Sequence, residues 1–134
     1  MAAKQDSLDP QTRDLVRFAA AIAQGYEPEL RERVSPLRSS QVPVQWVEEL
    51  LLQSVLMTGY PRALVAFTVW RKFSGVPAPD DDEGQDYGRA AEWTRRGEEV
   101  CGTVYGENYR KLRESVRVLH PAVDAWMLTE GYGR

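Results

Sequence analysis

The sequence predicts an all-α protein, and three observations lead to this class. Apolar residues recur at helical spacing along most of the chain. No stretch keeps the apolar–polar alternation of a β-strand. Glycine and proline stand where helices would end and begin. We expect about six to seven helices in one compact domain, residues 1–134, because this length suits a single domain.

The first two predicted helices lie between residues 9 and 37. Asp9 suits the N-cap of the first helix and Pro10 its first helical position. Gly25 is expected to end this helix. The second helix should run from Pro28 to Leu37, although Pro36 removes a hydrogen bond inside it and predicts a kink.

The stretch from Val44 to Phe73 is predicted to form two buried helices. Gly59 suits the end of the first, and Pro61 suits the first turn of the second. Between Trp46 and Met57, apolar residues fall on almost every side of the helical wheel, which is typical of a helix buried all round. A domain of this size cannot easily surround such a helix, so we expect an obligate oligomer.

Two polar residues interrupt this apolar helix. Glu49 and Gln53 are four positions apart and therefore share one face. A carboxylate among apolar residues is seldom fully buried unless it is paired. Two interpretations remain open: the face holds an arginine from a neighbouring element as a structural pair, or it lines a pocket.

The C-terminal half begins with a break in the helical pattern. Residues 74–87, SGVPAPDDDEGQDY, are predicted to be an acidic, solvated linker, because blocks of like charge are usually solvated. Residues 88–134 are helical again, with helices expected to end near Gly106, to span Tyr109 to Leu119 and to begin at Pro121.

Three features of this half are interpreted as structural. The sixth helix should present a solvent face of paired charges, formed by Arg110, Lys111, Arg113 and Arg117 with Glu107 and Glu114. His120 precedes a proline and is expected at a helix boundary. Cys101 is expected to be a small buried side chain.

Composition excludes several classes of function. The net charge of −3 gives no basic field for nucleic acid. The single cysteine excludes an internal disulfide, a CxxC redox pair and a cysteine zinc site, and we expect no metal. The N-terminus has no secretory signal, and no apolar run is long enough for a membrane span, so we expect a cytoplasmic protein.

Residues Leu8 to Phe67 resemble the carboxymuconolactone decarboxylase family, the relatives of alkylhydroperoxidase D. The matching stretches are LDPQTRDLVRFAAAIA, ELRERV and EELLLQSVLMTGYPRALVAF. The family core would thus lie in residues 8–73. The resemblance implies a compact helical alkylhydroperoxidase D-like fold that forms homo-oligomers, trimers or hexamers, with sites near subunit contacts.

The C-terminal half also resembles this family, in an unexpected order. RRGEEVCGTVYGENYRKL and DAWMLTEGYGR are similar to segments that come before the LD..TR block in the family's decarboxylases. Circular permutation and a truncated tandem arrangement both explain this order. We favour permutation, because chain termini often lie close together and tolerate it.

The resemblance implies one of two chemistries. The peroxidase branch uses a CxxC pair on the third helix, and its absence here makes dithiol peroxidase activity unlikely. The decarboxylase branch uses no cofactor and acts on a small carboxylated lactone. It must bind carboxylates, stabilise an enolate and protonate carbon. A non-enzymatic oligomer that binds a small anion or a partner on the same fold is the alternative.

The candidate site follows from this resemblance. Glu49 is the expected proton carrier and Gln53 a hydrogen-bond donor to a carbonyl oxygen. Arg33, Tyr60 and Arg62 are expected to bind substrate, with Trp46 and Trp70 as apolar walls. The N-terminus of the helix at Pro61 favours anions. The chain departs from the decarboxylases at several positions, above all at Arg33, which stands where they carry a histidine and cannot act as a base.

Overall fold

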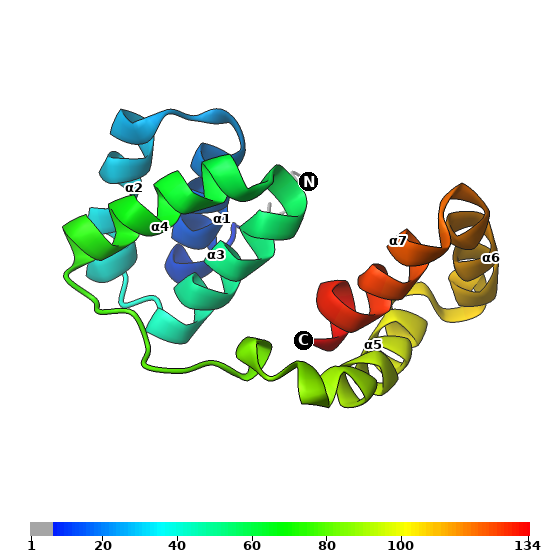
Figure 1. The fold of residues 1–134 in the computed structure, drawn as a ribbon. Helices are drawn as coiled ribbons and strands as arrows, with labels where there is room; N and C mark the ends of the chain where they lie inside the picture. Colours follow the sequence, from blue (N-terminus) through cyan, green and yellow to red (C-terminus); the bar gives the residue numbers. More distant parts are fainter. Residues whose placement is uncertain (1–6) are drawn as a thin grey trace, which may run out of the picture. The chain divides into compact units, whose positions relative to one another are not determined.

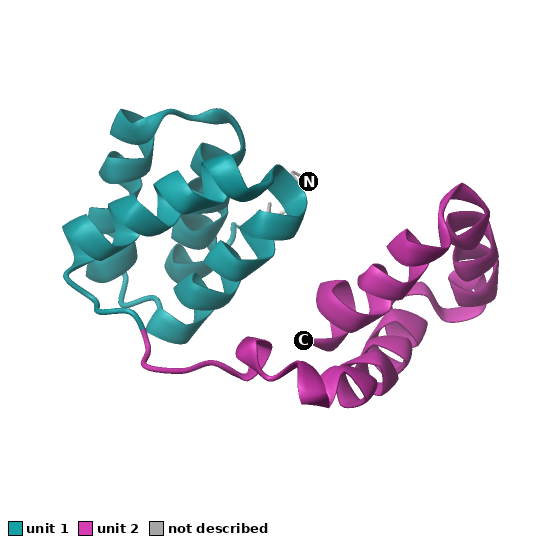
Figure 2. Cartoon of the chain, in the orientation of Figure 1, with its two compact units in different colours: residues 1–78 teal, residues 79–134 magenta. Residues whose placement is uncertain are grey.

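The structure, a computed structural model, describes residues 7–134. Residues 1–6, which carry most of the N-terminus examined above for a secretory signal, lie outside the described residues. The chain divides into two compact units, unit 1 up to Ala78 and unit 2 from Pro79 to Arg134 (Figure 2). Regular structure in the described residues is helical throughout, which confirms the all-α prediction (Figure 1).

Unit 1 consists of four helices, α1 (Pro10–Gln24), α2 (Glu27–Ser39), α3 (Val44–Thr58) and α4 (Tyr60–Ser74). The predicted boundaries at Pro10, Gly25 and Gly59 are confirmed, whereas α2 is longer than the predicted Pro28 to Leu37. The Asp9 carboxylate accepts a hydrogen bond from the Thr12 backbone N–H at 2.9 Å and so caps α1. Gly59, with φ 84°, separates α3 from α4 in a conformation that other residues seldom adopt. Pro36 does not end α2, which continues to Ser39.

The core of unit 1 is made of large apolar side chains from all four helices. Its fully buried members include Phe18, Ile22, Leu37, Leu51 and Trp70. The expectation that α3 is buried on every side is wrong for a single chain. Only its Val47, Leu51 and Ser54 positions are buried, and apolar residues on its other faces are exposed. The three other helices of unit 1 can cover one face of α3 but not its whole circumference.

Unit 2 contains α5 (Ala90–Tyr105), α6 (Tyr109–Leu119) and α7 (Pro121–Trp126), with short 3₁₀ turns at Glu83–Gln85, Tyr87–Arg89 and Gly106–Asn108. The last segment, η4 (Met127–Gly133), is a π-helix. His120 lies at the predicted boundary, where its Nδ1 accepts a hydrogen bond from the Ala122 N–H at 3.1 Å and caps α7.

The backbones of α5 and η4 lie in direct contact. A Cβ atom on Gly97 would stand 1.8 Å from the Leu128 carbonyl oxygen. A Cβ atom on Gly133 would stand 2.0 Å from the Trp93 carbonyl oxygen. Real Cβ atoms do not approach backbone oxygens so closely, so both positions require glycine. The two glycines therefore set the distance at which the first and last helical segments of unit 2 pack.

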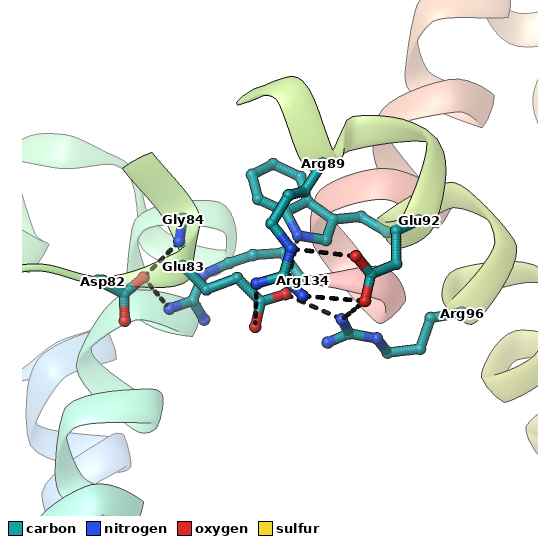
Figure 3. A network of polar contacts seen from close by, with 8 residues as sticks. Asp82, Glu83, Gly84, Arg89, Glu92, Arg96 and Arg134 are labelled. Carbon is teal, nitrogen blue, oxygen red and sulfur yellow. Dashed lines mark hydrogen bonds and ion pairs between the residues drawn. The ribbon is translucent and has the colours of Figure 1, made fainter. Parts of the chain in front are cut away.

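The acidic stretch is partly folded onto unit 2. The Glu83 carboxylate accepts hydrogen bonds from Trp93 Nε1 and from Arg96 Nη2, both at 2.9 Å. Asp82 accepts from the Gly84 N–H and pairs with Arg134 (Figure 3). The prediction that residues 74–87 are solvated is therefore wrong for Asp82 and Glu83. Their partner arginines lie later in the chain, so the run of acidic residues alone does not reveal these pairs.

The polar face predicted for α6 is also corrected at one position. Arg113 donates to both carboxylate oxygens of Asp124, at 2.6 and 3.0 Å, and Asp124 is buried. The Arg113 hydrogen bonds hold the pKa of Asp124 below its usual value. The exposed Arg110–Glu114 pair at 3.0 Å matches the prediction. Arg113 instead ties α6 to α7.

Candidate functional site

Four of the predicted site residues lie on the outer side of α3 and the start of α4. Trp46, Glu49 and Gln53 follow one another at three- and four-residue spacing, so helix geometry places them along one face. Glu49 is exposed, Gln53 half-buried and Trp46 48 % exposed. Tyr60, at the start of α4, is also exposed. A carboxyl group, a carboxamide and aromatic rings thus lie on the outside of one helix and at the start of the next.

Arg62 takes a position at the end of α1. Its Nη1 donates to the Gly25 carbonyl oxygen at 2.9 Å and lies 3.4 Å from that of Ile22. The positively charged side chain thus binds carbonyl groups that the end of α1 leaves unpaired. Arg62 also lines an open cavity of about 410 Å³ with Tyr26, Glu27 and other residues of α1, α2 and α4. Its guanidinium therefore has a structural role and stands beside a cavity.

Trp70 belongs to the core. It is fully buried, and its Nε1 donates to Glu48 Oε1 at 2.9 Å. Arg71 binds both oxygens of the same carboxylate, each at 2.6 Å. Glu48, the neighbour of Glu49, thus forms an ion pair with an arginine of an adjacent helix, the kind of contact that the sequence suggested for Glu49. Sequence reasoning missed this role, because an acid at either position fits the apolar pattern until the position of Arg71 is known.

Arg33 lies half-buried on α2. Within residues 7–134 its side chain has no ion pair or hydrogen bond, so it is not the partner of Glu49. Glu49 and Arg33 therefore do not form a structural ion pair with each other. Arg33 keeps its full capacity to bind a carboxylate.

A second polar cluster in unit 1 was not predicted. The buried carboxylate of Asp14 accepts a hydrogen bond from the Ser40 hydroxyl and lies 3.3 Å from Arg13 Nε. The hydrogen bond from Ser40, followed by that from Arg13, lowers the pKa of Asp14. Nearby, Gln11 Nε2 donates to the Gln41 carbonyl oxygen at 3.0 Å, where Gln41 has φ 56°. These contacts hold α1 against the turn between α2 and α3, a structural role that the local sequence does not signal.

The only cysteine and the only histidine of the chain lie in unit 2. Cys101 is fully buried in α5, and burial raises the pKa of its thiol. His120, the only histidine of the chain, caps α7. The hydrogen bond with Tyr105, together with burial, raises the pKa of Tyr132 to about 12. Within unit 1, the candidate chemistry therefore rests on carboxyl, carboxamide and guanidinium groups.

Fold and site together define a class: a helical protein with a carboxylate and a carboxamide on the outer face of an apolar helix, and no cysteine on that helix. The model of the carboxymuconolactone decarboxylase family matches residues 1–72, which is more than half of the chain. The protein belongs to the carboxymuconolactone decarboxylase family. No curated protein and no solved structure matches the chain. The matched residues end before unit 2 begins.

The described part of the chain was also searched for membrane-spanning helices. Between residues 7 and 134, no helix is both long and apolar enough to cross a bilayer.

Proposed function

We propose that the protein is a cofactor-free lyase that decarboxylates a small carboxylated lactone or keto acid. The observation that carries the proposal is the outer face of α3, where Glu49 and Gln53 lie between exposed aromatic residues in the helix that the family match covers. A carboxyl group and a carboxamide are the two groups that such a reaction needs once the substrate is bound: one supplies a proton, and the other stabilises an oxyanion.

The reaction requires no electron donor or acceptor. The bond between the substrate carbon and its carboxylate breaks, CO₂ leaves, and the electron pair stays on carbon, delocalised into the adjacent carbonyl oxygen. The Gln53 N–H donates to that oxygen as negative charge develops on it. The Glu49 carboxyl group then passes a proton to the carbon, forming a C–H bond, and takes up another proton from solvent.

Cationic and aromatic residues provide binding. Arg33, which has no ion pair within the described residues, would bind the remaining carboxylate of the substrate. Trp46, three positions before Glu49 on α3, and Tyr60, at the start of α4, offer exposed apolar surface. Arg62 can add positive charge from the cavity beside α1. Trp70 would act indirectly, by holding Glu48 and Arg71 in the core behind α3.

The alternative function is a non-enzymatic oligomer that binds a small anion or a partner. One observation favours it: the only imidazole of the chain is used as a helix cap in unit 2, and Arg33 stands where the related decarboxylases carry histidine. An arginine binds a carboxylate but does not transfer a proton at ordinary pH. Anion binding would thus remain although one proton-transfer group is missing.

The test is CO₂ release from 4-carboxymuconolactone by the purified protein, compared with Glu49→Gln and the control Glu32→Gln. Glu32 is an exposed acid on α2 outside the candidate site. We expect turnover in the wild type, a loss of 100-fold or more in Glu49→Gln and little change in Glu32→Gln, because a positioned acid contributes about 10²–10⁴-fold.

Two results would redirect the proposal. Equal turnover in both variants would remove Glu49 from the proton transfer. No turnover by a folded wild-type protein on carboxylated lactones and keto acids, together with calorimetric binding of the same compounds that Arg33→Gln abolishes, would establish the binding function instead.

A further inference from the structure

A hollow with an apolar wall and charged edges lies between α2 and α4 of unit 1, and none of its lining residues belongs to α3. Its volume is about 420 Å³, within the range of roughly 300–1,000 Å³ that is usual for small-molecule sites. The helices α2 and α4 pack against each other (Figure 1). The lining residues are Glu27 of α2 and, from α4, Leu64, Val65, Thr68, Val69, Lys72 and Phe73.

Two cations lie against the aromatic ring of this hollow. Lys72 Nζ stands 5.4 Å from the centroid of the Phe73 ring, and the guanidinium carbon of Arg31, on α2, stands 5.2 Å from it. The two charges are therefore separated by about one Debye length or less at 0.1 M salt, roughly 10 Å, and repel each other. Within residues 7–134 neither cation has an ion pair or a hydrogen bond. An anion beside them would relieve the repulsion.

Among the lining side chains, Lys72 supplies the hydrogen-bond donors for a ligand. The Thr68 hydroxyl already donates to the Leu64 carbonyl oxygen at 2.8 Å. The Glu27 carboxylate accepts hydrogen bonds but donates none while it is ionised. The Lys72 ammonium group has three N–H donors, and its contact within the described part of the chain is with the Phe73 ring. A negatively charged acceptor therefore fits beside Lys72.

A second hollow on the same unit shows what distinguishes these cations. It has a similar volume, about 410 Å³, and is lined by an arginine, Arg62. The Arg62 Nη1 already donates to the Gly25 carbonyl oxygen and lies 3.4 Å from that of Ile22. Its charge thus stabilises the end of α1, whereas the charges of Lys72 and Arg31 have no such partner. Of these two hollows, the one at Lys72 has the cations that are free to bind a ligand.

We propose that this hollow binds a carboxylate with an apolar body, of the class of the medium-chain aliphatic acids. The carboxylate group lies beside Lys72 and within the field of Arg31, and the hydrocarbon chain lies against the wall formed by Leu64 and Val65. Binding makes and breaks no covalent bond. The apolar body distinguishes this ligand from the polar lactones and keto acids of the proposed function, and the hollow is separate from the candidate face of α3.

Glu27 provides a check on the sign of the ligand's charge. It lines the same hollow, and its side chain has no ion pair or hydrogen bond within the described residues. Its carboxylate repels a carboxylate ligand but would attract an amine. Removal of the Glu27 charge should therefore strengthen the binding of an anion, whereas removal of the Lys72 or Arg31 charge should weaken it. A cationic ligand would show the opposite sign in all three cases.

The first experiment is isothermal titration calorimetry of the full chain with octanoate, with butyrate, hexanoate and 1-octanol as matched probes. We expect the affinity to rise by up to about four-fold per methylene group from butyrate to octanoate, the factor that corresponds to about 0.8 kcal/mol per buried CH₂. We expect 1-octanol to bind more weakly than octanoate, because it lacks the charge. Equal affinity for all chain lengths, or binding of 1-octanol as tight as that of octanoate, would overturn the proposal.

The charged groups are tested by the same octanoate titration of Lys72→Gln, Arg31→Gln and Glu27→Gln, with Arg38→Gln as the control. Arg38 is exposed on α2 and does not line the hollow. We expect the affinity to fall about three-fold in each of the first two variants, to rise about two-fold in Glu27→Gln and to stay unchanged in the control, since exposed ion pairs contribute up to about five-fold. Equal affinities of Lys72→Gln and Arg38→Gln would contradict the assignment.

The apolar wall is tested by Val65→Ser. Val65 lines the hollow and is 43 % exposed, so its replacement leaves the core intact. The control is Val16→Ser on α1, where the valine is 52 % exposed and lies outside the hollow. We expect the gain per methylene group to decrease in Val65→Ser and to remain in Val16→Ser. The same gain in both variants would show that the ligand chain does not contact this wall.

Arg33→Gln separates this inference from the proposed function. Arg33 is the residue proposed to bind the substrate carboxylate at the candidate site, and we expect octanoate binding to survive its replacement. Loss of octanoate binding in Arg33→Gln but not in Lys72→Gln would place the ligand at the candidate site and overturn the inference. Octanoate binding that depends on Lys72, in a protein without turnover, would leave this site standing and remove the lyase function.

Discussion

Each of the two units of this chain is stabilised internally by a different kind of contact. Unit 1 buries large apolar side chains from four helices around one centre. In unit 2 the fully buried side chains are few, among them Trp93, Cys101 and Leu128. Its helical segments are joined by backbone contact at two glycines and by arginine–carboxylate pairs.

This difference predicts which amino-acid substitutions each unit tolerates. An apolar core accepts exchanges of similar volume at modest cost, because neighbouring side chains can adjust. A carbonyl oxygen packed against a glycine cannot move aside without breaking the helix that carries it. The buried Asp124 carboxylate depends chiefly on the guanidinium of Arg113. Unit 2 should therefore be sensitive to very small substitutions, and the predictions below test this from the largest effect to the smallest.

The largest effect is expected for Gly97→Ala. The new methyl group would collide with the Leu128 carbonyl group, so α5 and η4 must separate, and we expect a loss of more than about 3 kcal/mol in the stability of unit 2. The control is Gly102→Ala on the same helix, whose nearest neighbour would be the Tyr109 ring at 3.9 Å. It should be neutral or stabilising by up to about 1 kcal/mol, because alanine is the better helix former. Amide exchange measured peptide by peptide resolves the two units, and equal effects of the two variants would contradict the backbone-contact account.

The next effect is expected for Arg113→Met. This change leaves the buried Asp124 carboxylate with only Arg117, at 3.4 Å, and should cost unit 2 about 3 kcal/mol. Arg110→Met, which removes an exposed pair with Glu114, should cost less than about 0.5 kcal/mol. Urea denaturation followed by fluorescence and circular dichroism checks both. A similar small cost for both variants would show that the Arg113 pair contributes no more than a surface pair.

The same pair predicts how unit 2 responds to acid. The pKa of Asp124 is lowered in the folded state, so its contribution to stability is present at neutral pH. This contribution is lost as the pH falls from about 5, through the ordinary aspartate pKa near 3.9, towards the lower folded value. We expect Asp124→Asn to flatten the pH dependence of unit 2 stability below pH 5. An unchanged acid profile in this variant would mean that other carboxylates govern the transition.

The smallest effect is expected in unit 1, for Glu48→Gln. The change weakens the bidentate pair with Arg71 but keeps an acceptor for the Trp70 indole N–H, so about 1–2 kcal/mol should be lost. Glu32→Gln on α2 serves as the control and should change stability by less than 0.5 kcal/mol, roughly the limit for surface substitutions. A loss in Glu48→Gln as large as that in Arg113→Met would remove the contrast between the units.

The helices themselves could be predicted from the sequence, because their ends are fixed by local chemistry. Asp9, Gly25, Gly59 and His120 act at the positions where their capping and stopping preferences placed them. These signals involve residues a few positions apart, so no knowledge of the fold is needed to interpret them.

Contacts between helices were harder to predict from the sequence. Periodicity placed Glu48 and Glu49 on an apolar helix but could not tell which acid faces Arg71, because that depends on how α4 packs. Gly97 and Gly133 gave no apolar signal, although they determine the packing of unit 2. Arg113 carries the same charge as its exposed neighbours, and only the position of Asp124 distinguishes it. The sequence therefore predicted that Glu49 and Gln53 share one face of α3, but it did not predict how exposed that face is or which groups it contacts.

The contact between α5 and η4 also bears on how the protein is made. Unit 1 lies within the first 78 residues of the chain, so its helices can pack against one another while the ribosome is still adding the residues of unit 2. Unit 2 closes only when η4 reaches α5, and η4 is its last element. Synthesis therefore produces a folded unit 1 before α5 can pack against η4. A chaperone that follows nascent chains would meet unit 2, rather than unit 1, in an open state.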